Sequence, residues 1–416
     1  MKMVLPLLLA ACLAVAASAA APSSSFPNHG KQILRFAEDS FCSTLVLVHG
    51  YPCQEFKVTT PDGYILRVHR IPHGVAGVSS PSPKPVFLQH GVLQGGDDWV
   101  FYPPRNSLGF VLADEGFDVW IGNLRGTHWS RQHVSYSSGD KAYWDWTWDG
   151  HAQYDLPAML NLVHENTGSE LYYVGHSQGT LIALAAFSES KLMNVVRAAV
   201  LLSPIAYLKG MTSTLSRLAA LLYMDQIYDD VGLSQFTLES GIGAYLLRNL
   251  CSLDPRCADL LVLVTGNSCN FIKSLHVFAF WTGRNCCFNA SLTSYYRQFE
   301  PQGSSTKNLV HLAQMVRTGL FAKFDYGSSL GNMRAYSQVV PPTYEPANIP
   351  KSFPVFLVYG GKDTLSTPQG VQELAKRLVC TQQTLFLPNY AHADFVVGTR
   401  ARQDVFDPVI KFIKAN

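Results

Sequence analysis

Residues 172–180 read YYVGHSQGT, an apolar and aromatic run followed by a serine that stands between two glycines. The five residues GHSQG form a G-x-S-x-G pattern around Ser177. In one interpretation this is only a tight strand-to-helix turn, where glycines relieve crowding. In the other, Ser177 is a nucleophile presented on a strained turn above a sheet. The rest of the chain has to decide between them.

Short apolar runs alternate with helical patterns along much of the chain. Helical periodicity is present at 149–165, 179–188 and 367–378. Strands that alternate with helices and read as continuous apolar runs indicate a mostly parallel sheet covered on both faces. The sequence therefore predicts an α/β fold. Its expected strands are residues 56–60, 64–69, 86–88, 118–121, 171–174, 198–202, 355–359 and 384–387.

The N-terminus has the pattern of a secretory signal peptide. Lys2 precedes a long apolar stretch, and small residues around Ala19 offer a cleavage site. We predict a signal peptide at 1–20, no stable transmembrane anchor, and secretion out of the cell or into a vacuolar or lysosomal lumen.

The composition favours a globular protein with an uncharged partner. The 416 residues are 47% hydrophobic, and the formal net charge is +2. Such a chain can bury a large core. A nearly balanced charge without a long basic run gives no reason to expect a nucleic-acid partner.

Eight cysteines remain after the predicted signal peptide, and an even number suits disulfides in an oxidising compartment. The pairing stays open, with Cys42 and Cys53 as a natural local pair and a buried free thiol as the alternative for each cysteine.

No C-x-x-C or H-E-x-x-H spacing is present, so no metal site is expected. Asn289 begins an N-glycosylation sequon.

The alternation of strands and helices stops between 203 and 337. Five of the eight cysteines lie there, among many aromatic residues. Leu215, Leu218, Ala219 and Leu222 recur at helical spacing. We predict that 203–337 is an inserted helical cap, and that 21–202 and 338–416 together form the core domain.

A serine nucleophile requires a base, a group that orients the base, and donors for the oxyanion. Asp363 follows the expected strand 355–359, and His392 follows the next one. Side chains at the carboxyl ends of parallel strands gather at one edge of the sheet. The order Ser177, Asp363, His392 is that of the α/β-hydrolase fold.

Backbone donors for the oxyanion are expected at two places. One is the N–H of Gln178, directly after the nucleophile, and the other is the N–H of Val92 in the FLQHGVLQG loop. Because the donor is backbone, Gln178→Ala is expected to retain much activity, whereas a proline there removes the donor.

Several alternatives remain beside these roles. Asp394 and Asp325 are alternative acids, but neither directly follows a core strand. Asp155 is interpreted as a helix-start or packing carboxylate. The histidines His90 and His176 lie beside the expected site and are interpreted as structural, since the elbow and the oxyanion loop use their backbone. Three tryptophans, Trp144, Trp146 and Trp148, are expected to pack rather than to bind substrate.

Seven motifs together resemble the acid or gastric-type lipases, the family of lysosomal acid lipase and related secreted lipases. They span nearly the whole mature chain. Leucine is more usual in the family at the position of Val92, and Ala391 precedes His392 where the family usually has asparagine. The motifs are DGYILRVHRIP (62–72), LQHGVLQGGDDWV (88–100), GNLRGTHWSR (122–131), YDLPAML (154–160), YVGHSQGT (173–180), YGGKDTLS (359–366) and NYAHADF (389–395).

The resemblance implies an α/β-hydrolase core with a helical cap and movable lid, and hydrolysis of neutral-lipid esters at an oil–water interface. Triacylglycerols are the main substrates of such enzymes, and some members cleave steryl esters. It also implies Ser177 as nucleophile, Asp363 as acid and His392 as base, with no cofactor. The rival hypotheses are an esterase for soluble esters, an acyltransferase, and a non-catalytic binding protein of the same fold.

Overall fold

The computed structural model describes residues 40–78, 81–212, 234–237 and 299–416. The predicted signal peptide, the glycosylation sequon at Asn289 and the helical pattern at 215–222 lie outside these ranges. In the part of the chain that is described, no helix is long and apolar enough to cross a membrane.

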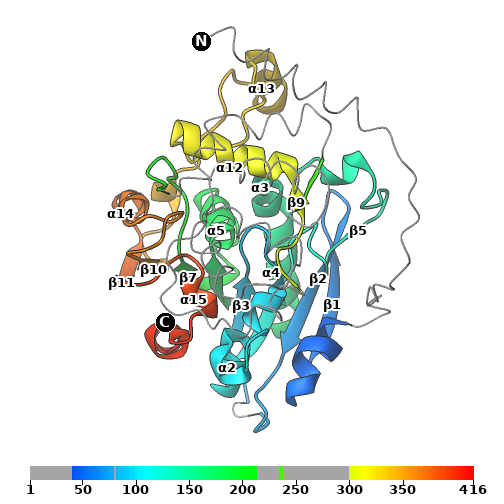
Figure 1. Cartoon of the computed structure of the whole chain (residues 1–416), viewed down its shortest axis with the longest axis vertical. Helices are drawn as coiled ribbons and strands as arrows, with labels where there is room; N and C mark the ends of the chain where they lie inside the picture. The colour runs from blue at the N-terminus through cyan, green and yellow to red at the C-terminus, as the bar shows by residue number, and fades with distance from the viewer. Residues whose placement is uncertain (1–39, 79–80, 213–233, 238–298) are drawn as a thin grey trace, which may run out of the picture. The chain divides into compact units, whose positions relative to one another are not determined.

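A single large sheet runs through the described residues (Figure 1). Its strand order is β1-β2-β4-β3-β6-β7-β10-β11, with β5 paired to β2. The strands from β4 to β11 are parallel to their neighbours, whereas β2 is antiparallel to β1, β4 and β5. Their bounds are β1 (Gln54–Thr59), β2 (Tyr64–Ile71), β3 (Pro85–Gln89), β4 (Asp118–Gly122), β5 (Gln132–His133), β6 (Leu171–His176), β7 (Val196–Leu202), β10 (Pro354–Gly360) and β11 (Thr381–Leu387).

The mostly parallel α/β sheet predicted from the sequence is confirmed. All eight expected strands are present with small shifts at their ends. The central strands β3, β4 and β6 are buried along their whole length, as their continuous apolar sequences indicate. Strand β11 is different, because it lies at the edge of the sheet, and four of its seven residues are exposed while the other three are half-buried.

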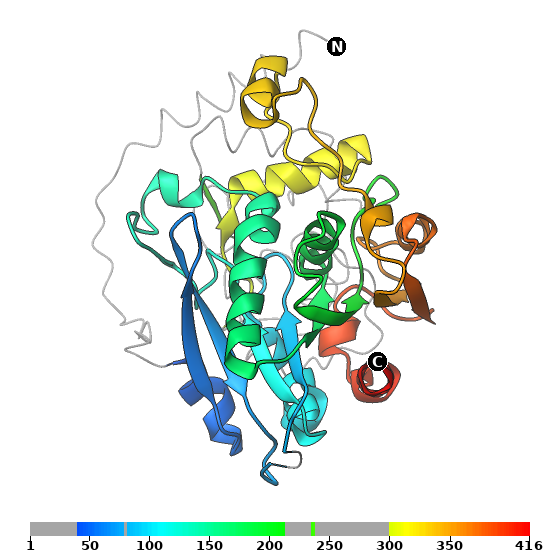
Figure 2. The same cartoon turned by 180° about the vertical axis from the view of Figure 1, so that it is seen from behind.

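Helices cover both faces of the sheet. Successive side chains of a strand point to opposite faces, so an apolar strand has to be covered on both sides. On one face, Tyr173 and Leu201 pack in a cluster with α4 (Leu156–Thr167) and α5 (Gln178–Ser188). On the other, Val174 and Val200 pack in a cluster with α2 (Leu108–Asp114) and α16 (Asp407–Ala415). Helix α4 lies in front of the sheet in Figure 2 and behind it in Figure 1.

The α-helices of the described ranges are α2 (Leu108–Asp114), α3 (Trp148–Gly150), α4 (Leu156–Thr167), α5 (Gln178–Ser188), α12 (Thr306–Thr318), α13 (Ser329–Tyr336), α14 (Pro368–Arg377), α15 (Asp394–Val397) and α16 (Asp407–Ala415). Short 3₁₀ and π turns join them: η1 (Cys42–Val46), η2 (Leu47–His49), η3 (Gly96–Trp99), η4 (Pro104–Asn106), η5 (Lys141–Trp144), η6 (His151–Asp155), η9 (Pro346–Asn348) and η10 (Arg402–Phe406). The helix expected at 149–165 is thus divided into α3, the π turn η6 and α4.

Two strands of two residues each lie outside the main sheet. Strand β8 (Gln235–Phe236) pairs antiparallel with β9 (Ser304–Ser305), and α12 follows β9 directly. Helix α12 crosses above α5 in both views of the molecule (Figures 1 and 2). Asn308, in the first turn of α12, is hydrogen-bonded to Gln178 at the start of α5.

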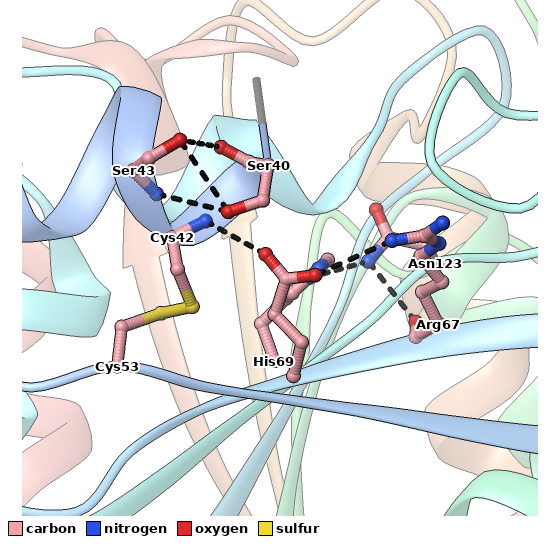
Figure 3. Close-up of a disulfide and its surroundings, with 8 residues drawn as sticks. Ser40, Cys42, Ser43, Cys53, Arg67, His69 and Asn123 are labelled. Carbon is pink, nitrogen blue, oxygen red and sulfur yellow. Dashed lines mark hydrogen bonds and ion pairs between the residues drawn. A yellow bond between two sulfur atoms is a disulfide. The ribbon is translucent and has the colours of Figure 1, made fainter. Parts of the chain in front are cut away.

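A disulfide joins Cys42 of η1 to Cys53, just before β1 (Figure 3). The local pairing expected from the sequence is therefore confirmed. The backbone N–H of Cys42 also donates to Glu55 Oε1 at 3.2 Å, so two contacts hold η1 to the first strand. Cys380 is a buried free thiol in the part of the chain that the structure describes.

Candidate active site

Ser177 sits on the sharp turn between β6 and α5. Its backbone has φ 53° and ψ −120°, a strained conformation that residues other than glycine rarely adopt. The serine N–H donates to the carbonyl oxygen of Leu202 on β7 at 3.1 Å, which ties the turn to the neighbouring strand. The turn thus holds the hydroxyl above the carboxyl end of the sheet.

The two glycines of the pentapeptide are needed because other backbone lies close to them. A Cβ on Gly179 would be 2.6 Å from the carbonyl oxygen of Gln89, at the end of β3. A Cβ on Gly175 would be 2.9 Å from the carbonyl carbon of Gly179. Any side chain at either position would push the turn away from β3 or from the start of α5.

His392 lies beside the serine, on the loop that follows β11. Its Nε2 is 2.7 Å from Ser177 Oγ, and its Nδ1 is 2.9 Å from Oδ2 of Asp363. The side chains of all three are buried. The structure therefore brings together the three side chains singled out in the sequence, in the geometry that a base needs to take the hydroxyl proton.

Asp363 is held on the loop after β10 by two backbone donors. The N–H groups of Leu365 and Ser366 donate to its Oδ1 at 2.9 and 2.8 Å, which leaves Oδ2 for the imidazole. The alternative acids have other partners: Asp394 Oδ2 accepts the N–H of Ala391, and Asp325 Oδ1 accepts the N–H of Gly327.

The loop after β3 reaches the nucleophile directly. A Cβ on Gly91 would lie 2.8 Å from Ser177 Cβ, so the loop contacts the serine with no room for a side chain. The N–H of Gly91 donates to Gln94 Oε1 at 2.9 Å. Val92, the next residue, is half-buried. Gln178 is the first residue of α5, where a helix has N–H groups without partners inside the helix.

His176 connects this loop to the histidine loop. Its Nε2 donates to the carbonyl oxygen of His392 at 2.9 Å, and its Nδ1 lies 3.1 Å from Gln94 Oε1. Burial lowers the pKa of His176 to about 3, with a further contribution from the neighbouring His392, so the ring is neutral. The contact between His176 and His392 spans 216 residues of sequence.

His90 holds the loop after β3 in place through both of its ring nitrogens. The N–H of Leu124 donates to its Nε2 at 3.1 Å, and the other ring nitrogen then donates to the carbonyl oxygen of Gly91 at 2.8 Å. Burial lowers the pKa of His90 to about 4, so this arrangement of one acceptor and one donor nitrogen is preserved at neutral pH.

Three buried carboxyl groups lie just beyond the loop, and no sequence motif indicates them. One oxygen each of Asp97, Asp98 and Glu300 lies within 4.8 Å of the others. Asp97 Oδ1 accepts Trp129 Nε1 at 3.0 Å and Gln302 Nε2 at 2.8 Å. Burial raises the pKa of Asp97 to about 6 and raises the pKa of Asp98 and Glu300 well above the usual range.

Asp155 belongs to the core, in agreement with its interpretation as a packing carboxylate. Its Oδ1 is 2.6 Å from an amino group of Arg125, whose other amino group is 2.6 Å from Oδ2 of Asp62. The guanidinium lies 3.8 Å over the ring of Tyr64.

The predicted packing role of the three tryptophans is also confirmed, because all are buried in one hydrophobic cluster: Trp144, Trp146 and Trp148.

Two family models match the chain. The partial alpha/beta-hydrolase lipase region matches residues 42–102, and the alpha/beta hydrolase fold matches 84–238. Triacylglycerol lipase 2 of Arabidopsis thaliana is 39% identical over 393 residues, which are 92% of this chain and 90% of that protein. The chain belongs to the gastric-type lipase family. Gastric triacylglycerol lipase of Rattus norvegicus is 36% identical over 89% of this chain and 91% of its own length.

Membership of the gastric-type lipase family agrees with the resemblance seen in the sequence motifs. Among solved structures, a highly thermostable carboxyl esterase from Bacillus coagulans, in complex with glycerol, matches with a TM-score of 0.52. The two chains are 14% identical, and the match covers 87% of this chain and 98% of the esterase. At this identity the likeness supports the α/β-hydrolase fold alone.

Proposed function

We propose that the protein is a serine lipase that hydrolyses ester bonds of neutral lipids, with triacylglycerols as the main substrate class. The observation that carries the proposal is the contact of His392 Nε2 with Ser177 Oγ at 2.7 Å, supported by Asp363 on the far side of the ring. The names of the family members supply the substrate class, since relatives from a plant and a mammal are called triacylglycerol lipases.

In the proposed mechanism, Ser177 Oγ attacks the ester carbonyl carbon while His392 accepts the hydroxyl proton. The N–H groups of Gln178 and Val92 stabilise the oxyanion. The alcohol leaves with the proton from His392, and the acyl group stays on the serine. Water, activated by His392, then releases the fatty acid and restores the serine. Asp363 holds the correct ring tautomer, because its carboxylate accepts from Nδ1–H.

We further propose that residues 203–337 form a cap over the core made of 21–202 and 338–416. Support comes from the described ends of this stretch: Ser305 Oγ donates to the carbonyl oxygen of Trp144, and Gln302 N–H donates to Leu93 O at 2.9 Å. The contact with Leu93 puts Gln302 against the loop after β3, as expected of a segment that returns from a cap to the core. With the leader pattern at 1–20, we propose a secreted or lumenal enzyme that acts at an oil–water interface.

The test compares an emulsified long-chain triacylglycerol with a soluble short-chain ester, each hydrolysed by the mature protein and by Ser177→Ala. A lipase releases fatty acid at a rate that rises above the solubility limit of the substrate, and the variant releases none. Cleavage of only the short ester would identify a soluble-ester esterase. Folded protein that cleaves neither substrate would favour the non-catalytic alternative.

A further inference from the structure

The side chain of Gln178 is buried, although its proposed role uses only its backbone N–H. Two elements enclose it. One is the π turn η6, which precedes α4, and the other is the first turn of α12. None of the three side chains at 177, 363 and 392 comes from either element, so these contacts form a separate layer around the site.

Each end of the Gln178 carboxamide has one hydrogen-bond partner. Its Nε2 is 2.9 Å from Nδ1 of His151 in η6. Its Oε1 accepts Nδ2 of Asn308 in α12 at 3.1 Å. Asn308 Nδ2 is also 3.1 Å from the hydroxyl of Ser304, which fixes the amide of the asparagine. The three side chains thus form a chain of hydrogen bonds from α12 through α5 to η6.

The donors and acceptors along this chain match. The Gln178 amide nitrogen donates, so Nδ1 of His151 must be the unprotonated ring nitrogen. Burial lowers the pKa of His151 well below its usual value, and the nearby Arg125 lowers it further. The ring is therefore neutral and able to accept. Among the described residues, Nε2 of His151 has no hydrogen-bond partner, so the contact of Nδ1 with Gln178 restrains the ring together with its packing on Trp146.

This restraint matters because of where Gln178 stands. The first N–H groups of a helix have no partner inside the helix, so tertiary contacts decide where they point. A side chain held from two sides limits rotation of the peptide that joins Ser177 to Gln178. An oxyanion donor works only when it is already aimed at the position of the developing charge.

We propose that His151 and Asn308 are positioning residues that hold the Gln178 side chain so that its backbone N–H points into the oxyanion site. The inference rests on the proposed function and adds two residues to it that do not touch substrate. Loss of either one should lower kcat and leave KM nearly unchanged, because the misplaced donor weakens binding of the transition state more than binding of the ester.

The experiment measures kcat and KM of Asn308→Ala on a soluble short-chain ester. Rates are expressed per active site, counted by stoichiometric inactivation with a phosphonate ester, so that misfolded protein does not contribute. We expect kcat to fall about tenfold, because a small displacement of a preorganised group has effects of this order. The matched control is Gln314→Ala, which removes hydrogen bonds from the same helix to Asp325 but none to Gln178.

A second pair of measurements separates positioning from general loss of stability. Asn308→Ala combined with Gln178→Met should be no slower than Gln178→Met alone, since both changes break one chain of contacts. If Asn308→Ala does not fold, His151→Ala makes the same test from the η6 side.

Two results would overturn the inference: a kcat of Asn308→Ala within about twofold of wild type, or an equal fall in Gln314→Ala. Either can occur while wild type and Ser177→Ala behave as the proposed function requires. If the wild-type protein cleaves no ester at all, the proposed function fails and the inference fails with it.

Discussion

Asp363 Oδ2 lies 2.9 Å from His392 Nδ1, although 29 residues and a full helix–strand unit separate the two in sequence. The contact follows from the parallel pairing of β10 with β11, whose carboxyl ends lie side by side. Leu357 pairs with Thr384 in this register, and the loops after the two strands leave the sheet at the same edge.

Asp363→Asn should lower kcat by about 10⁴-fold, because the amide favours the wrong imidazole tautomer. The matched control is Asp394→Asn, which changes a buried carboxylate two residues after His392. We expect the control to retain activity within about tenfold, since its carboxylate bonds to the Ala391 N–H. Steady-state hydrolysis of a soluble ester measures both. Equal losses would reject Asp363 as the orienting acid.

The order of the candidate triad could be predicted because each member stands directly after a strand that the apolar pattern reveals. The strands at 355–359 and 384–387 are recognisable from their apolar residues, and the loops that carry Asp363 and His392 come after them in the chain. The disulfide could be anticipated because Cys42 and Cys53 are close in sequence. Local patterns were sufficient for these features.

The contacts that surround the triad could not be predicted in this way. Asn308 lies 130 residues from Gln178, and Glu300 lies 205 residues from Gly95, to which it is hydrogen-bonded. No periodicity links such positions, and the motifs give no reason to pair them. From the sequence alone Gln178→Ala is expected to retain much activity, whereas the buried contacts of the Gln178 side chain argue for a larger loss.

Stability should depend on pH through Asp97. Burial raises the pKa of Asp97 in the folded protein to about 6, above the usual value of 3.8. The folded state therefore binds the proton more tightly than the unfolded chain does. This contribution is fully present below about pH 4 and is lost as pH rises through about 6. The groups that face Asp97 are Trp129, Gln302 and the carboxylates of Asp98 and Glu300.

Asp97→Asn replaces the carboxyl group with a neutral amide of similar shape. Relative to wild type, the variant should gain stability between pH 4 and pH 7, on the order of 3 kcal/mol at most. Urea unfolding at several pH values measures the difference. The same change at exposed Asp407 is the control, and a parallel pH trend in both variants would contradict the assignment to Asp97.

Gly179→Ala should destabilise the turn at Ser177. The added Cβ would lie 2.6 Å from Gln89 O and 2.9 Å from His90 O, both of which are backbone atoms that cannot rotate away. Overpacking of this kind costs about 1 to 3 kcal/mol. Gly139→Ala, whose Cβ would meet nothing closer than 3.6 Å, should change the free energy of unfolding far less. Chemical denaturation compares the two.

Removal of the Cys42–Cys53 disulfide should destabilise the protein by about 3 kcal/mol, the loop-entropy value for a short closed loop. The paired variant Cys42→Ser with Cys53→Ser gives this value in urea unfolding under oxidising conditions. The control is Cys380→Ser, which changes a buried thiol outside any disulfide of the described residues. A paired variant as stable as wild type would show that the bond adds no stability.

The direct pairing of β7 with β10 has a consequence for how the lipase can change over evolution. Val200 lies opposite Phe356, yet residues 203–353 pass between the two strands. The entropic cost of closing a connection grows only slowly with its length, so that doubling the length costs about 0.6 kcal/mol more. Insertions and replacements in this interval therefore change the folding free energy of the core little. New substrate preferences can arise there while the catalytic framework stays intact.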